Sequence, residues 1–282
     1  MSEHVSFSQY STFSRCGKQY QLERIQGVPR TPSLALLFGS AVHEAFERVL
    51  KSEGEPIAGS VQEMWGEIVQ SHTDRMVAEF NTPIEGFKIS GRKTEAKPNR
   101  EDYDWWMIEG LQQVNAFLEW LGTSGWGIYA VEDQVPMVEF NATGILGGVE
   151  VKAFIDSLMV NPDGELVVVD FKTGSRTPQE LQLGVYSALL QQRMGLHVDK
   201  GAYYMTRKAE MSEQFDLRRY TPEFFGTVFG QFAAAKELGL FIPSIGDHCK
   251  WACDVSHACA AVGGVDAYKF DPLHPSYNPS NK

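Results

Sequence analysis

Residues 147–186 read GGVEVKAFIDSLMVNPDGELVVVDFKTGSRTPQELQLGVY, and this stretch decides the fold that we expect. Two apolar runs, Val149–Val160 and Leu166–Phe171, flank the sequence Asn-Pro-Asp-Gly at positions 161–164. Residues of these types interrupt strands and favour tight turns. The stretch therefore predicts a β-hairpin.

The second predicted strand carries charged side chains on one of its two faces. Because side chains alternate in direction along a strand, Asp170 and Lys172 share one face. The opposite face is apolar and holds Val167, Val169 and Phe171. The first strand carries one acid among apolar residues, Asp156, and the hairpin folds it back beside the second strand. Two carboxylates and one ammonium group are therefore expected to converge.

This convergence of charges needs a compensating partner, because an ionised carboxylate buried in an apolar sheet costs several kcal/mol without one. Asp156 and Asp170 would hold Mg²⁺ or Mn²⁺ through oxygen ligands, which these hard cations prefer. Lys172 would then orient the attacking water and offset charge that develops on a phosphate. The structural alternative is a strand-end ion pair of Asp170 and Lys172, with Asp156 as an edge charge against aggregation.

A polar pair follows on the next predicted helix. The sequence Pro-Gln-Glu at 178–180 is a typical helix start, and Leu181–Gln192 has apolar residues at helical spacing. Gln182 and Tyr186 are four residues apart, so they project from one face of this helix. Such a pair suits a helix that faces a substrate, although an exposed glutamine and a half-buried tyrosine are each ordinary alone.

A further candidate ligand lies upstream of the hairpin. Ser40 is a good N-cap for a helix over Ala41–Leu50, and His43 lies at the edge of its apolar stripe, in the first turn. A histidine in such a place is usually a hydrogen-bonded core residue, but neutral imidazole is also a frequent metal ligand. His43 is therefore a candidate for the same metal site.

The order of the predicted elements indicates an α/β fold. Helices, strands and the hairpin are expected over Val61–Phe80, Tyr103–Leu121, Gly127–Phe140, Val149–Phe171, Leu181–Gln192, Gly201–Thr206 and Pro222–Leu238. This order predicts a mixed central β-sheet flanked by helices. Residues 59–125 would form a helical insertion, and residues 127–240 the catalytic core with Glu132 and Glu139 as further acids.

Two segments are locally basic. Lys88–Arg100 holds five lysines and arginines and is expected to be a mobile loop that either contacts a phosphate backbone or is simply solvated. The same two alternatives apply to Arg15, Lys18 and Arg24 near the amino terminus. The whole chain has a formal net charge of −11, which argues against non-specific wrapping of nucleic acid. A local basic groove beside an acidic metal site is compatible with that total.

The four cysteines form one pattern, with Cys16 far upstream of Cys249, Cys253 and Cys259. The chain start lacks the features of a signal peptide, and no apolar run approaches the roughly 20 residues of a membrane-spanning helix. We therefore expect an intracellular protein and not a disulfide scaffold. Metal ligation explains the clustering better than core packing does. Zinc and an iron–sulfur cluster both accept four thiolates, and His257 is an alternative ligand.

Together these motifs resemble the PD-(D/E)XK nuclease superfamily, in its RecB-like exonuclease branch. The matching residues are His43 in Gly-Ser-Ala-Val-His-Glu, Asp156 in Phe-Ile-Asp, Asp170 to Gly174 in Asp-Phe-Lys-Thr-Gly, and Gln182 with Tyr186. Within that branch, the one-plus-three cysteines resemble the iron–sulfur nucleases, such as the CRISPR-associated exonuclease (the fourth Cas protein) and the AddB nuclease domain. Phages encode stand-alone relatives.

This resemblance runs from about Phe7 to Cys259 and departs from the family at one point. Three residues separate Cys249 from Cys253, where the family usually has two. The resemblance implies a restriction-endonuclease-like core in a single nuclease domain over residues 1–265. A four-cysteine module would join the termini, and residues 266–282 would be a loose tail.

The implied activity is metal-dependent hydrolysis of DNA phosphodiester bonds. His43, Asp156, Asp170 and the backbone carbonyl of Phe171 would coordinate one or two Mg²⁺ or Mn²⁺ ions, Lys172 would position the water, and Gln182 and Tyr186 would hold DNA or Lys172. The cysteines would bind a [4Fe–4S] cluster in preference to zinc. The implied substrate is single-stranded DNA or duplex ends, degraded from the 5′ end in recombination, repair or end processing.

Two other functions stay open at this point. One is a catalytically silent module that binds DNA ends and uses its iron–sulfur or zinc site for assembly with a partner. The other is an unrelated structural protein that binds metal. A bound ion or the separation of the two carboxylates would discriminate among the three, and the sequence leaves the oligomeric state open.

Overall fold

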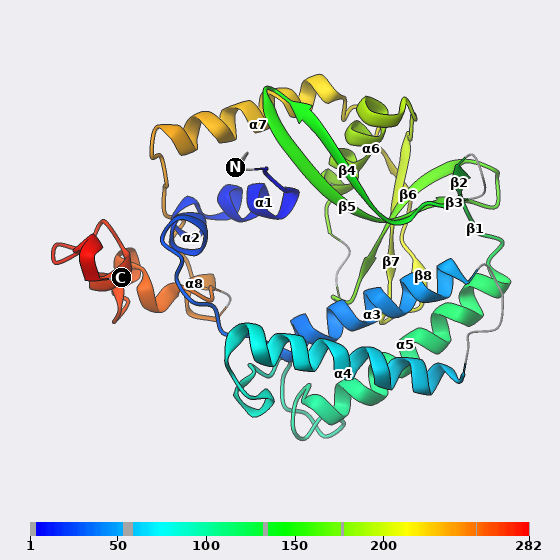
Figure 1. The fold of residues 1–282 in the computed structure, drawn as a ribbon, viewed down its shortest axis with the longest axis horizontal. Helices are drawn as coiled ribbons and strands as arrows, with labels where there is room; N and C mark the ends of the chain where they lie inside the picture. Colours follow the sequence, from blue (N-terminus) through cyan, green and yellow to red (C-terminus); the bar gives the residue numbers. More distant parts are fainter. Residues whose placement is uncertain (1–3, 53–58, 132–134, 176–177, 252, 282) are drawn as a thin grey trace. The chain divides into compact units, whose positions relative to one another are not determined.

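The computed structural model describes residues 4–52, 59–131, 135–175, 178–251 and 253–281 (Figure 1). The chain falls into two compact units, each built from segments that are distant in sequence. Unit 1 contains Met1–Thr31, Gly144–Lys152 and Glu223–Lys282, and unit 2 contains Pro32–Thr143 and Ala153–Pro222. One nuclease domain over residues 1–265 remains a prediction about how these units work together.

A seven-stranded mixed sheet contains the predicted hairpin. Its strands are β1 (Gly127–Ile128), β4 (Val138–Leu146), β5 (Val149–Val160), β6 (Leu166–Lys172), β7 (Lys200–Met205), β8 (Glu210–Met211) and β9 (Phe215–Asp216). The path β1-β5-β6-β7-β8 is antiparallel between β5 and β6 and parallel between β6 and β7. The predicted mixed sheet is therefore confirmed.

The turn between β5 and β6 forms for the reason that its residue types suggest. The Asn161 side-chain oxygen accepts hydrogen bonds from the backbone N–H groups of Asp163 (3.1 Å) and Glu165 (2.8 Å). Gly164 has a φ of +81°, in a region that residues with a side chain rarely adopt. These contacts set the register, in which Val160 pairs with Leu166 and Ser157 with Val169.

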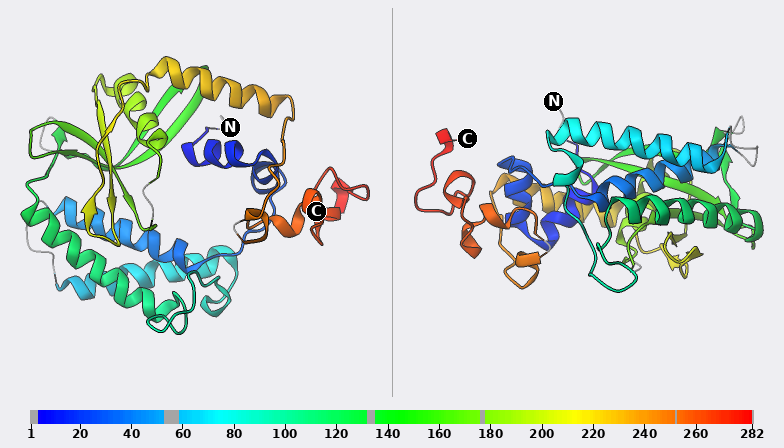
Figure 2. Two further views of the ribbon diagram at one scale, coloured as in Figure 1. Left: turned by 180° about the vertical axis from the view of Figure 1, so that it is seen from behind. Right: turned by 90° about the horizontal axis from the view of Figure 1, so that it is seen from below.

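Helices cover both faces of this sheet in unit 2. The apolar face of β6 packs against α3 (Leu34–Lys51) and α5 (Tyr103–Thr123), since the Phe171 ring centroid lies 5.1 Å from that of Phe46 and 5.5 Å from that of Phe117. Helix α4 (Val61–Phe80) packs on α3 and α5, and the three helices run side by side (Figures 1 and 2). Helix α6 (Leu181–Met194) covers the charged face. The predicted flanking helices are confirmed.

Helix α3 begins earlier than the sequence suggested. The expectation that Ser40 caps this helix is wrong, because Ser33 is the N-cap and its hydroxyl accepts a hydrogen bond from the Leu36 N–H at 3.2 Å. The buried apolar stripe continues upstream through Leu34, Leu37, Phe38 and Ala41. Burial of that stripe outweighs the weak helix propensity of Gly39-Ser40. His43 therefore lies in the middle of a long helix.

The stretch predicted as one strand over Gly127–Phe140 is broken. It contains β1, a separate ribbon of β2 (Ala130–Val131) and β3 (Val135–Pro136), and then the start of β4. Pro136 has no N–H to donate to a longer ladder. Glu139 has a φ of +43°, which makes the backbone irregular at the start of β4. Glu132 lies outside the described residues.

Close packing in unit 2 leads to a first prediction, at Gly110 of α5. A Cβ atom at Gly110 would lie 2.1 Å from a ring carbon of Trp65, which is fully buried. We expect Gly110→Ala to lower the free energy of unfolding by about 1–3 kcal/mol, although alanine is the better helix former. At Gly66 of α4 a Cβ atom would meet nothing within 4 Å. Gly66→Ala should therefore gain about 0.5–1 kcal/mol. Urea unfolding measures both, and equal effects at the two sites would contradict the packing.

Unit 1 is built around aromatic contacts. The Phe232 ring centroid lies 4.8 Å from that of Phe13 and 5.5 Å from that of Tyr20. Its helical elements are α1 (Phe7–Arg15), α2 (Gly17–Tyr20), the π-helical turn η1 (Gln21–Ile25), α7 (Pro222–Glu237), α8 (His248–Trp251), η4 (Ser256–Ala258), η5 (Ala260–Val262), α9 (Ala267–Phe270) and η6 (Pro279–Asn281). Unit 2 also has the short helix η2 (Ile84–Gly86).

None of the helices in the described ranges combines the length and apolar content that a membrane crossing needs.

Two expectations about unit 1 differ from the structure. Lys18 was expected to be solvated or to contact DNA, but it is 3% exposed and its ammonium lies 3.1 Å from a carboxylate oxygen of Asp271. The segment expected as a loose tail from residue 266 begins with helix α9, and Asp271 is fully buried. A buried charge needs a partner, and the two segments supply one to each other.

Candidate functional site

Asp170 is the centre of a polar network between β6 and α6. It is 2% exposed, and its Oδ1 accepts hydrogen bonds from the Gln182 side-chain amide (2.8 Å) and the Tyr186 hydroxyl (3.1 Å). Its Oδ2 lies 2.5 Å from the Lys172 ammonium. Lys172 also donates to the Gln182 side-chain oxygen at 3.0 Å. The structure therefore brings four of the predicted site residues together.

Asp156 lies beside this network at the point where the β5–β6 ladder ends. The last paired residues are Ser157 and Val169. Beyond them, the Phe171 N–H donates to Asp156 Oδ2 at 2.7 Å in place of a strand partner. The other oxygen, Oδ1, lies 3.4 Å from Nδ1 of His43, which α3 supplies. His43, Asp156 and Phe171 thus lie at one end of the hairpin.

The two carboxyl groups differ in how readily they ionise. Burial, with the charge of Asp156, raises the pKa of Asp170 to about 6 although Lys172 opposes the shift. Burial also raises the pKa of Asp156, but His43 and the Phe171 N–H outweigh it, so this pKa is lowered overall. Burial lowers the pKa of His43, yet the neighbouring carboxylates outweigh it and the net shift is upward. Of these two carboxyl groups, Asp170 is therefore the one whose ionised form is less stabilised.

The residues fit a divalent cation by their chemistry. Asp170 Oδ2 is buried and faces the Lys172 ammonium at 2.5 Å. Carboxylates, an imidazole and a backbone carbonyl are ligands that Mg²⁺ and Mn²⁺ accept. In the described ranges, no three His, Cys, Asp or Glu side chains already form a ligand shell. A cation would therefore replace the internal contacts of Lys172 and His43.

Two further residues lie at this site that the sequence did not single out. Tyr203 pairs with Asp170 in the β6–β7 register, and the Lys172 ammonium lies 5.5 Å from its ring centroid. Glu47, four residues after His43 on α3, shares a hydrogen bond with Glu139 that raises the pKa of Glu139 to about 7. The spacing of His43 and Glu47 was a visible signal. The position of Tyr203 was not, because it depends on strand register.

The four cysteines come together in unit 1, where they line one small cavity. All four are free thiols. Cys16 Sγ accepts hydrogen bonds from the backbone N–H groups of Gln19 and Ser244, each at 3.4 Å. Burial and the neighbouring sulfurs raise the pKa of Cys253 and of Cys259, and backbone N–H groups oppose this shift. His257, the alternative ligand, does not line the cavity, whereas His248 does.

The four thiols are donor types that zinc and iron–sulfur centres accept, but in the described part of the chain no three of them form a ligand shell as they stand. Thiols with a raised pKa stay protonated at neutral pH, and a bound metal is what stabilises the thiolate. Backbone N–H groups directed at the sulfurs are typical of such centres. The cavity therefore fits zinc or an iron–sulfur cluster on its donor set.

An α/β sheet with an Asp-x-Lys strand facing a Gln-x-x-x-Tyr helix defines a class of metal-dependent nuclease folds. A family model described as the PD-(D/E)XK nuclease superfamily matches residues 4–260. The chain belongs to the PD-(D/E)XK nuclease superfamily, which confirms the resemblance. Membership of a nuclease superfamily makes DNA the expected substrate class.

Relatives of the chain occur in mycobacteriophages. It is 30% identical over 277 residues to the Gene 69 protein of Mycobacterium phage D29. This alignment covers 90% of this chain and 95% of that protein. It is 28% identical over 297 residues to the Gene 69 protein of Mycobacterium phage L5, with the same coverage. The fold is also similar to that of a solved Eubacterium rectale protein that is provisionally named an exonuclease. The TM-score is 0.49 and the sequence identity 15%, and the match covers 89% of this chain and 88% of that one.

Proposed function

We propose that this chain is a metal-dependent DNA exonuclease that degrades single-stranded DNA from the 5′ end, in recombination, repair or processing of DNA ends. The observation that carries the proposal is the network in which Asp170 meets Lys172, Gln182 and Tyr186, with Asp156 and His43 beside it. A module that only binds DNA ends would not need a lysine held against a buried carboxylate.

Each residue has a role in this proposal. His43, Asp156, Asp170 and the Phe171 carbonyl would hold one or two Mg²⁺ or Mn²⁺ ions. When bound, such an ion polarises the scissile phosphate and lowers the pKa of its water. Lys172, released from Asp170, would orient the attacking water and offset negative charge on the phosphate. Gln182 and Tyr186 would keep Lys172 and Asp170 in place, because Gln182 bonds to both.

The experiment that tests the function is degradation of end-labelled DNA. Single-stranded and duplex substrates, labelled at either end, would be incubated with the protein and Mg²⁺ or Mn²⁺. The proposal expects cleavage that chelator stops, faster on single strands, with early release of the 5′ label. Release of the 3′ label first would reverse the polarity. DNA binding without cleavage, with metals intact, would instead support the silent module.

For the cysteine cluster we propose a [4Fe–4S] cluster that closes unit 1. Protein purified without oxygen is expected to be brown, with a broad visible band, and to contain about four irons per chain. Cys259→Ser should lose the band, because Cys259 is one of the proposed ligands. Ser256→Ala, in the same cavity lining, should keep it. A colourless protein that contains one zinc would replace the cluster with a structural zinc site.

A further inference from the structure

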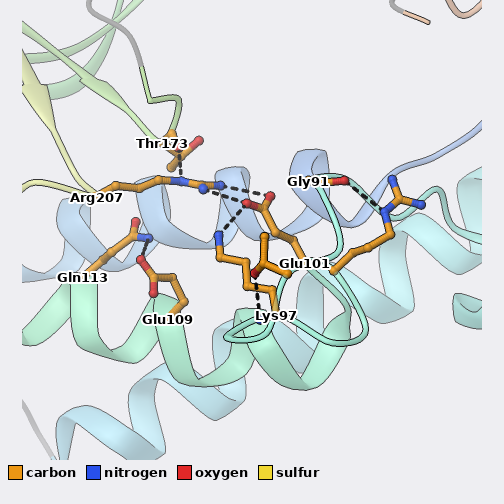
Figure 3. Close-up of polar contacts among 9 residues, drawn as sticks. Gly91, Lys97, Glu101, Glu109, Gln113, Thr173 and Arg207 are labelled. Atoms are coloured by element: carbon orange, nitrogen blue, oxygen red, sulfur yellow. Dashed lines mark hydrogen bonds and ion pairs between the residues drawn. The ribbon is translucent and has the colours of Figure 1, made fainter.

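The backbone that follows the proposed catalytic lysine is held by an arginine from another strand. Arg207 lies two residues beyond β7, and its Nε donates to the carbonyl of Thr173 at 2.8 Å. Its other two nitrogens donate to both oxygens of Glu101, at 2.9 and 3.3 Å. Figure 3 shows Arg207 extended between Thr173 on one side and Glu101 on the other. Thr173 directly follows Lys172.

Glu101 is in turn fixed by its surroundings. It is 7% exposed, just before α5, and Lys97 donates to it at 3.0 Å. Burial raises the pKa of Glu101, but the hydrogen bonds from Arg207 and Lys97 outweigh it and lower this pKa overall. A two-pronged arginine–carboxylate pair that is largely shielded from water is strong and directional. The guanidinium also lies 5.0 Å from the Trp106 ring centroid, which holds its plane.

A second connection holds the lysine itself from the same corner. The Thr206 N–H donates to the Lys172 carbonyl at 3.0 Å. The Thr206 hydroxyl donates to the side-chain oxygen of Gln113 on α5 at 2.6 Å, and both side chains are buried. Consecutive carbonyls, of residues 172 and 173, are thus held by residues 206 and 207. Both of those are anchored in the helical insertion at residues 59–125.

The basic loop before α5 has a structural role that the sequence did not indicate. Lys97 is committed to Glu101 and lies 4.2 Å from the Trp105 ring centroid. Arg100 donates to the backbone carbonyls of Ile89 and Gly91. These two cations therefore hold the loop that presents Glu101.

We propose that Glu101 and Arg207 are positioning residues for Lys172. They couple the helical insertion to the end of β6, so that the ammonium keeps its place between Asp170 and Gln182. The inference rests on the proposed nuclease function. Strand β6 ends at Lys172, and directly beyond it the Arg207 side chain binds the Thr173 carbonyl, where the strand ladder no longer continues. A misplacement of about 1 Å at a catalytic group can cost about 100-fold in rate.

The test uses Arg207→Lys, which keeps the charge but loses the fork, and Glu101→Gln, which keeps the shape but loses the charge. Arg218→Lys is the matched control, because Arg218 makes a similar forked pair with Asp216 in an exposed place. We expect Arg207→Lys to lower the single-turnover cleavage rate about 10–100-fold and leave the dissociation constant for DNA within about twofold. Arg218→Lys should leave both unchanged.

The readout that separates positioning from general structural support is coupling to Lys172. In a Lys172→Ala background, Arg207→Lys should lower the residual rate less than twofold, because its effect acts through the missing ammonium. An equal fold-change in both backgrounds, or weaker DNA binding in place of a slower rate, would overturn the proposal.

A second measurement keeps this inference separate from the proposed function. Hydrogen exchange of the peptide that spans residues 166–175 should be faster in Arg207→Lys than in the unsubstituted protein, and exchange in α4 unchanged. This holds whether or not the protein cleaves DNA. Absence of cleavage by the unsubstituted protein would count against the nuclease proposal. Unchanged exchange in that peptide would instead refute the positioning role of Glu101 and Arg207.

Discussion

Asp170→Asn is expected to lower the rate of DNA cleavage on the order of 10³-fold or more while the protein stays folded. Asparagine keeps an oxygen that can accept the hydrogen bonds from Gln182 and Tyr186. It removes the negative charge that would hold a cation and that lies 2.5 Å from Lys172. The loss should therefore fall on the chemical step and not on the fold.

The same substitution should leave the metal-free protein at least as stable as before. Because the pKa of Asp170 is raised to about 6, folding favours its protonated form, and at pH 7 its ionised form opposes folding. The neutral amide removes that penalty. Under the proposed function Mn²⁺ binds the folded protein, so it should raise the melting temperature of the unsubstituted protein but not that of the variant.

Single-turnover cleavage of end-labelled DNA measures the first effect and thermal unfolding the second. Asp163→Asn is the matched control, because Asp163 is an exposed acid in the turn of the same hairpin. It should cleave at the unsubstituted rate. An Asp170→Asn protein that keeps more than a tenth of that rate would show that Asp170 is not the central metal ligand.

Asp271→Ala is expected to reduce the free energy of unfolding by about 3–5 kcal/mol, a large part of the stability of an ordinary domain. Asp271 is fully buried and lies 3.1 Å from the buried ammonium of Lys18. Its other oxygen accepts a hydrogen bond from the Ala260 N–H at 2.8 Å. The substitution leaves the buried Lys18 ammonium without its charged partner, and it leaves the N–H groups of Ala260 and Leu273 without their acceptor. Lys18 follows Cys16 by two residues, and Ala260 directly follows Cys259.

Urea unfolding and the metal content of purified protein measure this effect together. The pair joins the segments that follow Cys16 and Cys259. Asp271→Ala should therefore also lose part of the iron or zinc that the proposed cysteine centre would bind. Asp266→Ala, which removes a half-exposed pair with Lys269, should cost less than about 1 kcal/mol. Adding Lys18→Met to Asp271→Ala should recover part of the loss, since it removes the unpaired charge. If both acid variants unfold alike, the buried pair does not hold the cysteine module.

Most of the local structure was predictable because its signals are local. The hairpin followed from two apolar runs around four turn residues, and α6 was predicted over Leu181–Gln192 and observed over Leu181–Met194. The grouping of Asp170 and Lys172 on one face followed from the alternation of side chains alone. The start of α3 was missed because burial of the upstream apolar stripe continues the helix past Ser40 to the N-cap at Ser33.

The sequence by itself determined most of the elements, since periodicity and turn chemistry act over a few residues. It also singled out six residues of the candidate site, His43, Asp156, Asp170, Lys172, Gln182 and Tyr186. Tertiary structure decided which charges are buried and which partners they meet. Lys18 and Asp271 are 253 positions apart, and Arg207 and Glu101 are 106 apart. Nothing in the residues around either pair distinguishes a paired, buried charge from a solvated one. That distinction arises only when packing removes water and leaves the opposite charge as the remaining partner.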